Sequence, residues 1–485
     1  MTDLVGLSLR QAADLVRTRQ VSPVEIAQTA LDRVQALGPR LNCLISVADD
    51  LLEQAGKSER EILRGRYRGT LHGLTVVVKD NLLTRDLPTS GGSLVVTDWR
   101  SRSGRDAHVV AALRTAGALI LGKTNLYELA YGYPHASFGT VTNPLLPGFT
   151  TGGSSNGSAA AAAAHLAYAA IGTDTGGSIR IPAAFCGLVG VKPTLGRVGR
   201  SGIIPLSTTL DHVGPLTRHV GDAAAVLDAI SGRDNGDPTT MRQDVGSVSA
   251  HLDEGVSKLR IGLLSASPTE VEEPLIAKAV ECAASGLTDL GASVREIDIS
   301  WLAEARYVGG ILTAVEAAEF HRDLVHENPS GYSPVILRRL RSGSVIPGAD
   351  YIRAQRARAV LAHRSDELFA HFDAVVLPAT LMKPLPIEQW VAVLGNSGQQ
   401  DTDSYKDAIT RFTSAWNVTG QPSVVLPFDA LPDGTPAAVQ IVGPRSADDV
   451  VLRIARSLEG VRPWQEPRPI SADAALTPVG VGITK

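Results

Sequence analysis

The apolar and polar residues of this chain alternate between helical and strand-like patterns. Two N-terminal segments repeat apolar residues at helical spacing, and each follows a serine, Ser8 or Ser22, that can cap the first turn. Short apolar runs predict buried strands within residues 72–83 and at 118–121. The helices predicted in this half are residues 9–20, 24–37, 108–115, 158–170 and 220–230.

The second half continues the alternation after a polar, turn-rich connection at residues 234–256. A helix is predicted at 273–290, and residues 301–371 have a mainly helical pattern. The strands predicted here are residues 259–264, 374–377, 424–427 and 438–442, of which the last two form a pair. Because strands and helices alternate without an internal repeat, the sequence predicts an α/β fold.

Composition narrows the class of protein. With 44% hydrophobic and 20% charged residues, the chain has the composition of a soluble globular protein. A net charge of −4 gives no basic footprint for nucleic acid and no polybasic patch for a membrane. Three cysteines in 485 residues exclude a disulfide scaffold and fit a reducing compartment, and no signal-peptide pattern begins the chain. We expect a cytoplasmic protein that binds a small molecule, and a homodimer is left open.

Two Gly-Gly-Ser turns carry the most distinctive chemistry. They end at Ser154 and Ser178 and flank an alanine-rich helix, and their glycines let the backbone approach a ligand closely. Lys79 lies upstream, directly after the apolar run Val76–Val78. This combination indicates acyl transfer of the serine–lysine type. We expect Ser178 to be the nucleophile and Lys79 the general base, because desolvation lowers a lysine pKa from its usual ~10.4.

The segments GGSSNGSAAAAAA, GTDTGGSIRIPAAFCGLVGVKPT, VVVKDN and ILGKTNLYELAYG together resemble the amidase signature family of serine hydrolases. With weaker matches at both ends, the resemblance covers roughly residues 5–460. It implies one large domain, residues 1–467, in which helices cover a mixed, twisted central sheet, with a signature core at about 70–235 and no cofactor. Residues 468–485 are rich in Pro, Ala and Gly and are predicted to form a poorly ordered tail.

The resemblance also assigns roles within the site. In this family a nucleophilic serine, a serine on a cis peptide and a lysine act together, which here implies Ser178, Ser154 and Lys79. Ser154 would relay a proton between the other two. The implied oxyanion hole consists of backbone N–H groups of residues Thr175, Gly176, Gly177 and Ser178.

Neighbouring polar residues are expected to support this arrangement. Asp174 can brace its loop through glycine N–H groups, and Ser155 is expected to hydrogen-bond rather than react. Arg180 is expected to pair with Asp174 or loop carbonyls, and the alternative is a clamp on a substrate carboxylate. An ion pair of Lys79 with Asp80 is the alternative to a catalytic base, although adjacent strand residues point to opposite faces.

Two other motifs favour different classes of protein. Residues 117–124 satisfy the Walker A pattern of a nucleotide-binding regulatory protein, but a phosphate loop must follow a strand, and here its variable residues form one. Residues 153–157 satisfy the G-x-S-x-G pattern of the α/β-hydrolase nucleophile elbow, which would make Ser155 the nucleophile. That elbow needs a strand before it and a catalytic histidine after it, but no convincing strand precedes these residues and no suitable histidine follows. Histidine and cysteine spacings give no support for a metal site.

Aromatic residues before the first turn are candidates for the wall of a substrate pocket, with simple packing as an equal alternative: Tyr127, Tyr131, Tyr133, Phe138 and Phe149. Such a wall favours a neutral apolar or aromatic acyl group, and further specificity loops are expected in residues 301–400. We therefore predict an amidohydrolase that can also cleave carbamates (urethanes) and esters. The alternative within the family is the glutamine-hydrolysing subunit of a tRNA-dependent amidotransferase, although residues 133–138 depart from its serine- and asparagine-rich segment.

Overall fold

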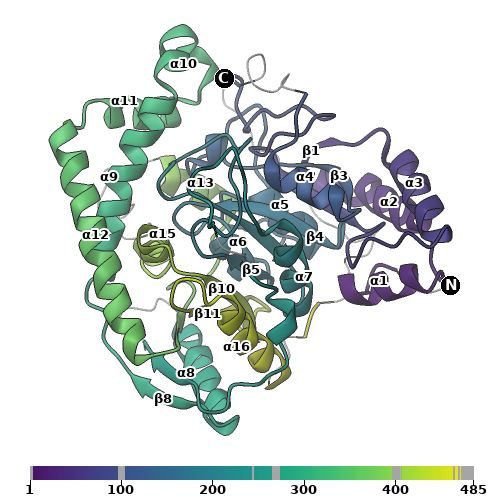
Figure 1. Ribbon diagram of the computed structural model, residues 1–485. Coiled ribbons are helices and arrows are strands. Elements are labelled where there is room, and N and C mark those ends of the chain that lie inside the picture. Colours follow the sequence, from purple (N-terminus) through teal and green to yellow (C-terminus); the bar gives the residue numbers. More distant parts are fainter. Residues whose placement is uncertain are drawn as a thin grey trace.

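Eleven strands in the described part of the chain form a single mixed sheet with helices on both faces (Figure 1). A computed structural model describes residues 4–96, 104–242, 245–264, 273–395, 405, 407–461, 465–467 and 470. The strand order is β1-β3-β2-β4-β6-β5-β10-β11-β9-β7-β8. This confirms the predicted α/β fold with a mixed central sheet. The predicted tail, residues 468–485, lies outside the described residues except for Ile470, and the domain boundary stays a prediction.

The strands are β1 (Leu44–Val47), β2 (Thr75–Lys79), β3 (Leu119–Thr124), β4 (Ala169–Asp174), β5 (Val189–Lys192), β6 (His212–Thr217), β7 (Arg260–Leu263), β8 (Ser293–Glu296), β9 (Ala374–Pro378), β10 (Ser423–Ala430) and β11 (Pro436–Val442). The neighbours β3, β2 and β4 run parallel, as do β9, β7 and β8. The central strands from β4 to β9 pair antiparallel, including the predicted pair β10 and β11.

The α-helices are α1 (Leu9–Arg17), α2 (Pro23–Leu41), α3 (Leu51–Leu63), α4 (His108–Thr115), α5 (Asn156–Ala163), α6 (Arg180–Phe185), α7 (Val220–Ile230), α8 (Pro274–Asp289), α9 (Leu302–Phe320), α10 (Arg322–Glu327), α11 (Pro334–Ser344), α12 (Gly348–His371), α13 (Ile387–Gly395), α15 (Ala415–Thr419) and α16 (Asp448–Val461). Short 3₁₀ turns are η1 (Glu128–Ala130), η2 (Ser249–His251) and η3 (Pro329–Gly331). The predicted caps are present, because Ser8 Oγ accepts from Gln11 N at 3.2 Å and Ser22 Oγ from Val24 N at 2.9 Å.

The helix predicted over residues 158–170 is wrong in its second half. α5 ends at Ala163, His165 adopts a left-handed φ of 56°, and Ala169 already belongs to strand β4. Alanine favours helix locally, but Ala169 and Ala170 pair with β2 in the buried middle of the sheet, and this tertiary context overrides propensity. Central strands β5 and β6 were missed because glycine, proline and lysine interrupt their apolar patterns.

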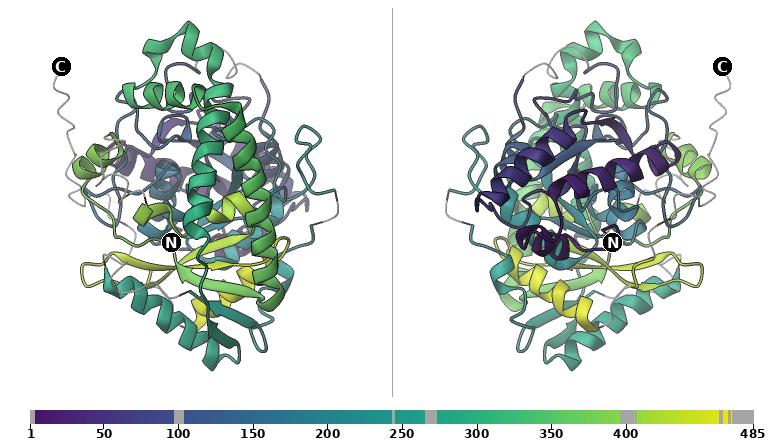
Figure 2. Two further views of the ribbon diagram at one scale, coloured as in Figure 1. Left: turned by 90° about the vertical axis from the view of Figure 1, so that its left-hand side faces the viewer. Right: turned by 90° about the vertical axis from the view of Figure 1, so that its right-hand side faces the viewer.

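The two faces of the sheet have separate hydrophobic cores. On one face, α1, α4, α7, α8 and α16 pack against side chains that include Val76 and Val78 of β2. On the other face, α2, α3, α5 and α6 pack against Val77, and α9, α12 and α15 continue this layer near β9. Figure 2 shows α9 and α12 on one side of the molecule and α1 and α2 on the opposite side. Alternation along β2 therefore directs Lys79 to the same face as Val77.

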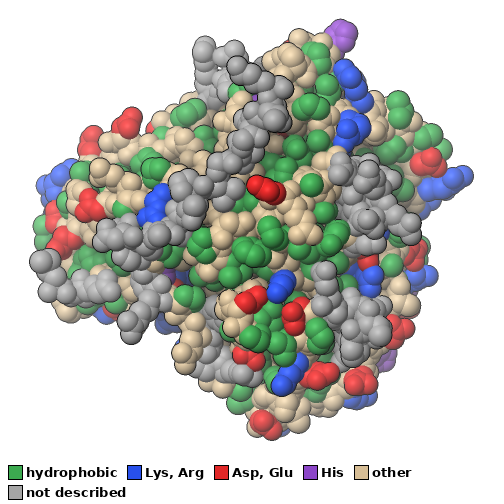
Figure 3. All heavy atoms as spheres, turned by 180° about the vertical axis from the view of Figure 1, so that it is seen from behind, with side chains coloured by type: hydrophobic (Ala, Val, Ile, Leu, Met, Phe, Trp, Pro, Cys, Tyr) green, Lys and Arg blue, Asp and Glu red, His purple; other side chains and the backbone are tan. Residues whose placement is uncertain are grey.

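The surface carries mixed charges. On the face shown in Figure 3, described basic and acidic side chains are interspersed among apolar ones. A basic stripe of the kind that binds nucleic acid does not gather among the described residues on this face. None of the helices in the described ranges is long and apolar enough to cross a membrane.

Candidate active site

Parallel strands β2 and β4 bring the first site residues together. Lys79 is the last residue of β2 and Asp174 the last of β4, and the two strands are direct neighbours. Because parallel strands end at the same edge of a sheet, the loops that follow them meet there. The loop after β4 carries Ser178, and the turn before α5 carries Ser154. The sheet thus assembles residues that lie up to about 100 positions apart in the sequence.

Lys79 is completely buried and has no carboxylate partner among the described residues. Its Nζ is hydrogen-bonded at 2.8 Å both to Ser154 Oγ and to Thr173 Oγ1. Burial lowers the pKa of Lys79 from 10.5 to about 7, and the negative charges of Asp174 and Asp211 oppose this shift. Near pH 7 a large fraction of this lysine is therefore a neutral amine, which can accept a proton.

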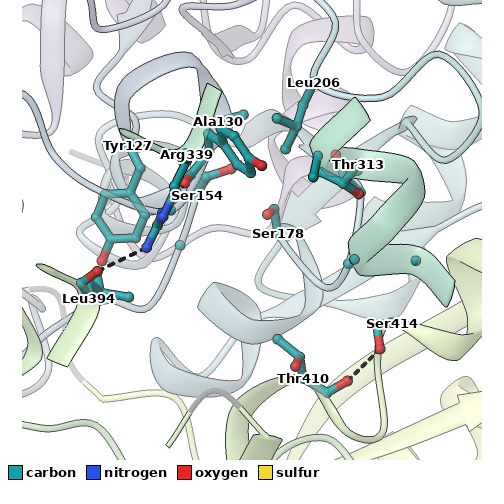
Figure 4. A pocket seen from close by; sticks show the side chains of 18 of the residues that line it. Tyr127, Ala130, Ser154, Ser178, Leu206, Thr313, Arg339, Leu394, Thr410 and Ser414 are labelled. Carbon is teal, nitrogen blue, oxygen red and sulfur yellow. Dashed lines mark hydrogen bonds between the residues drawn. The ribbon is translucent and has the colours of Figure 1, made fainter. Parts of the chain in front are cut away.

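Ser154 lies between the lysine and the open cavity. The Gly153–Ser154 peptide bond is cis, as the resemblance implied. A Cβ on Gly153 would lie 2.1 Å from Cε2 of Tyr127, so only glycine fits beside this ring. Ser154 and Ser178 both line the same cavity, and Ser178 is half-buried near its centre (Figure 4).

Ser155 lies behind this pair and is fully buried. Its Oγ donates to the carbonyl of Thr173 at 3.1 Å, and its N–H donates to the carbonyl of Ser178 at 3.2 Å. Ser155 does not line the cavity. These contacts brace the two serine turns against each other, and they leave no access for the G-x-S-x-G interpretation.

The loop before Ser178 presents backbone N–H groups toward the cavity. Thr175, Gly176 and Ser178 line the cavity, and among the described residues no acceptor is recorded for their N–H groups. The N–H of Gly177 instead donates to Asp174 Oδ1 at 2.9 Å. Three of the four expected oxyanion donors are therefore available, whereas Gly177 is already engaged.

The geometry explains why position 177 is glycine. Gly177 has φ +131°, which side chains rarely adopt, and a Cβ there would lie 2.5 Å from Thr413 Oγ1. The same Thr413 hydroxyl donates to the carbonyl of Gly176 at 2.7 Å. A residue more than 230 positions away thus fixes the orientation of the loop. Its sequence context gave no signal of this contact.

Arg180 is a structural partner of Asp174 in this fold. It is fully buried, and its guanidinium binds Asp174 at 2.9 and 3.0 Å, Gln440 Oε1 at 2.9 Å and Asn417 Oδ1 at 2.6 Å. Burial alone would raise the pKa of Asp174, but the Arg180 charge and the hydrogen bonds from Arg180, Asn417 and Ile179 N–H hold it well below its usual range. Arg180 does not line the cavity, which contradicts the carboxylate clamp.

The cavity has a volume of about 650 Å³, and helices supply most of its far wall. The full lining set is Tyr127, Ala130, Tyr131, Gly132, Gly153, Ser154, Thr175, Gly176, Ser178, Ile181, Leu206, Arg306, Gly309, Gly310, Thr313, Ala314, Arg338, Arg339, Ser342, Gly343, Ile346, Trp390, Leu394, Ile409, Thr410 and Ser414. Figure 4 shows Tyr127 and Leu394 on one side of Ser178, with Leu206 and Thr313 on the other. The region 301–400 contributes as expected, mainly through α9, α11 and α13, with Ile346 from the connection between α11 and α12.

Only two of the five aromatic residues proposed for the pocket wall line the cavity. Tyr127 and Tyr131 line the cavity, and the hydroxyl of Tyr127 accepts from Trp390 Nε1 at 2.5 Å. Three other predicted aromatics are not among the lining residues: Tyr133, Phe138 and Phe149. Phe138 packs edge-on against His135 at 6.0 Å, Phe149 bridges to Pro386, and Tyr133 is partly buried against two core clusters. The rings of Tyr133 and Phe138 therefore pack against the protein, and Phe149 lies outside the cavity wall.

The position of Lys123 contradicts two alternatives from the sequence, a phosphate-binding loop at residues 117–124 and an ion pair between Lys79 and Asp80. Lys123 of the Walker-like segment is buried on β3, where Nζ lies 3.1 Å from Asp80 Oδ1 and 2.6 Å from Thr89 Oγ1. It cannot reach a phosphate from there. The same ion pair shows that Asp80 faces Lys123 and not Lys79. Among the residues that the structure describes, no cluster of three or more His, Cys, Asp or Glu side chains could hold a metal ion.

Several polar residues of the site carried no clear signal in the sequence. Thr173 and Asn81 are hydrogen-bonded at 3.1 Å beside Lys79, and Asn81 could have been suspected from its place two residues after the lysine. Asp211 accepts from the hydroxyl of Thr175 at 2.5 Å. Because Asp211 lies 36 positions after Thr175, no local pattern links the two residues.

Comparison with known proteins agrees with this geometry. The sequence profile of the amidase family matches residues 25–452. An amidase from Pseudomonas putida is 34% identical over 470 residues, covering 97% of this chain and 99% of the relative. The solved peptide amidase from Stenotrophomonas maltophilia superposes with a TM-score of 0.84 at 32% identity, covering 97% of this chain and 99% of that chain.

Subunits of tRNA-dependent amidotransferases are also among the relatives. One subunit of the glutamyl-tRNA(Gln) amidotransferase from Dehalococcoides mccartyi is 31% identical over 498 residues, covering 97% of this chain and 100% of the relative. Similarity of this extent fixes the family but does not separate its branches. The chain belongs to the amidase family of amide-hydrolysing enzymes.

Proposed function

We propose that this protein hydrolyses amide bonds through an acyl-enzyme on Ser178. Neutral Lys79 accepts a proton from Ser154, which accepts the proton of Ser178 as Ser178 Oγ attacks the substrate carbonyl carbon. The free N–H groups of Thr175, Gly176 and Ser178 stabilise the oxyanion that forms. The relayed proton then passes to the leaving nitrogen as the C–N bond breaks. Water attacks the resulting ester and releases the carboxylic acid, so carbamates and esters are also chemically competent substrates.

The observation that supports this proposal most strongly is the buried amine of Lys79. It lies 2.8 Å from Ser154 Oγ, and its pKa is lowered to about 7. Two other buried lysines lack such a serine partner: Lys123 faces the carboxylate of Asp80, and Lys192 donates to the backbone carbonyls of Pro193 and Gln421. Uncharged hydrogen-bond partners and desolvation instead suit a general base.

We further propose that the substrates are bulky and mainly apolar. The volume of about 650 Å³ lies in the range of sites for drug-sized ligands. Apolar side chains near Ser178 include Ile181, Leu206 and Leu394, with the rings of Tyr127 and Trp390. An aryl or long aliphatic acyl group would fill such a cavity, whereas a small aliphatic amide would leave much of it unoccupied.

Gly310 supports a role for cavity size. It lies inside helix α9 and lines the cavity, and a Cβ placed there would meet no atom within 4 Å. A glycine inside a helix costs about 1 kcal/mol relative to alanine, and no packing contact accounts for this one. We infer that this open position in the cavity wall leaves space for substrate.

A hydrolysis screen tests both statements. We expect activity on aryl amides to exceed activity on small aliphatic amides and glutamine, with carbamates and esters as further substrates. Gly310→Val should lower kcat/KM for the bulkiest substrates while it spares small ones. Gly460→Val is the matched control, because Gly460 is an exposed glycine of α16 with equally open surroundings and does not line the cavity. If kcat/KM depends on substrate size in the same way in both variants, the proposed role of cavity size is contradicted. If the wild-type protein hydrolyses none of these substrates, the amidase proposal is contradicted.

The second candidate is a glutamine-hydrolysing subunit, which the similarity to the amidotransferase relative favours. Glutamine carries an ammonium group that needs a negative partner. Among the described residues, the charged side chains that line the cavity are Arg306, Arg338 and Arg339, and none of these lining residues is an aspartate or a glutamate. Glutaminase activity that appears only with added partner subunits would favour this candidate over the first.

Two further expectations belong to this proposal. Cys43, Cys186 and Cys282 are all free, which suits a cytoplasmic protein. The homodimer stays a prediction, and light scattering of the purified protein would decide it.

A further inference from the structure

Asp211 is a buried carboxylate for which the proton relay has no use. It directly precedes β6 and is 4% exposed. One carboxylate oxygen accepts from the Thr175 hydroxyl at 2.5 Å, and the other accepts from the N–H groups of Leu206 and Ser207 at 2.9 and 3.1 Å. Three short hydrogen bonds hold this buried carboxylate in one position.

The Asp211 carboxylate lies beside the start of the oxyanion loop, residues 175–178. In the antiparallel ladder between β4 and β6, Asp174 is the partner of His212. Thr175 and Asp211 are the next residues beyond this last pair, so their side-chain bond continues the ladder by one step. The N–H of Thr175 is one of the three available oxyanion donors, and its position depends on how its own side chain is held.

We propose that Asp211 is a positioning residue of the acyl-transfer site, which holds Thr175 so that the N–H groups of the oxyanion loop face the attacked carbonyl. The inference rests on the proposed function, because it needs an oxyanion to form at this loop. Small displacements of such donors weaken transition-state stabilisation without changing substrate binding to the same extent.

A second carboxylate, that of Glu316, holds the segment before Asp211 in place. Glu316 of α9 accepts from the Ser207 hydroxyl at 2.6 Å and from the N–H of Thr209 at 3.0 Å. The hydroxyl of Tyr351 adds a further bond to Glu316 at 2.8 Å. The segment 207–209 is therefore anchored independently of Asp211, so a change at Asp211 is expected to act on Thr175 first.

The charge of Asp211 supplies a separate readout. Asp174 and Asp211 both act on Lys79 and favour its protonated form. Asp174 is paired with Arg180, whereas Arg200 acts on the Asp211 carboxylate only through its charge. Burial raises the pKa of Asp211 to about 6, and its hydrogen bonds oppose this shift, so Asp211 is ionised at neutral pH. Loss of this negative charge makes Lys79 easier to deprotonate.

The test uses Asp211→Asn and Thr175→Val, which preserve side-chain size. Asp448→Asn is the matched control. Asp448 is 1% exposed and accepts from the N–H and hydroxyl of Thr194 at 2.8 and 2.6 Å, but it begins α16 and does not line the cavity. Thermal stability, kcat, KM and the pH profile of kcat/KM are measured for all variants with a neutral aryl amide.

We expect Asp211→Asn to lower kcat by ~10- to 100-fold, less than the loss of a whole oxyanion donor, with little change in KM. Its pH profile should rise at lower pH than that of the wild type. Thr175→Val should lower kcat similarly, and the double variant should lose less than the product of the two single losses. Asp448→Asn should lower stability alone.

Wild-type kcat and an unshifted pH profile in Asp211→Asn, or losses matched by Asp448→Asn, would overturn the positioning role. A stability loss in Asp211→Asn does not obscure this result, because the pH profile is measured on the folded fraction. If the wild-type protein neither hydrolyses amides nor reacts with a fluorophosphonate at Ser178, the proposed function fails instead. The two failures are thus distinguishable.

Discussion

The pH dependence of turnover follows from the burial of Lys79. The relay needs the neutral amine, and the pKa is lowered from 10.5 to about 7. About half of the lysine is then neutral at pH 7, compared with roughly 1 molecule in 3,000 for an unperturbed lysine. Burial thus increases the active form at neutral pH on the order of 10³-fold.

The assay is kcat/KM for a substrate without an ionisable group, from pH 5 to pH 10. We expect a rise with unit slope, about a tenth of the plateau at pH 6 and about nine tenths at pH 8. Lys79→Arg should lose at least ~10³-fold at every pH, because a guanidinium remains protonated. Lys79→Ala should be similarly impaired.

The same shift predicts a change in stability. In the window from about pH 7 to 10.5, the unfolded protein binds a proton on Lys79 that the folded protein does not. Stability should therefore rise with pH by about 1.4 kcal/mol per unit from this residue, and Lys79→Met should lack this part of the slope. A midpoint of activity at pH 9 to 10 would contradict the lowered pKa of Lys79, and a Lys79→Arg enzyme with near-normal activity would refute the lysine-base mechanism.

Three other substitutions test neighbouring parts of the site. Ser154→Ala should lower kcat by ~10²-fold or more, and combining it with Lys79→Ala should add little, whereas multiplicative losses would argue against one relay. Arg180→Ala should destabilise the protein by about 3–5 kcal/mol in thermal unfolding, because Asp174 would remain buried and unpaired, and activity should fall for all substrates alike. A loss confined to acidic substrates would instead indicate a clamp. Ser155→Ala should lower stability but leave fluorophosphonate labelling intact, and lost labelling with a stable fold would give Ser155 a chemical role.

The elements with strong local patterns could be predicted from the sequence. The capped helices beginning after Ser8 and Ser22 and the apolar run before Lys79 are determined by neighbours within a few residues. The residues on the glycine turns were found for the same reason, because Ser154 and Ser178 stand in a continuous motif. These are local signals, and the fold preserves them.

The parts that failed depend on contacts between distant segments. Ala169 and Ala170 form a strand because β2 lies beside them, which alanine content cannot reveal. Tyr133 and Phe138 precede the first serine turn just as Tyr127 does, yet only the fold decides which ring faces the cavity. The braces from Asn417 to Arg180 span more than 230 positions and leave no local pattern.

The central claim is that Ser178 forms a covalent acyl-enzyme. A fluorophosphonate or a slowly hydrolysed aryl carbamate, followed by intact-mass measurement and peptide mapping, tests it most directly. The account predicts one added group per chain, located on Ser178, absent from Ser178→Ala and retained in Ser155→Ala. A label on Ser155 or another residue, or turnover of amides by a folded Ser178→Ala protein at the wild-type rate, would contradict it.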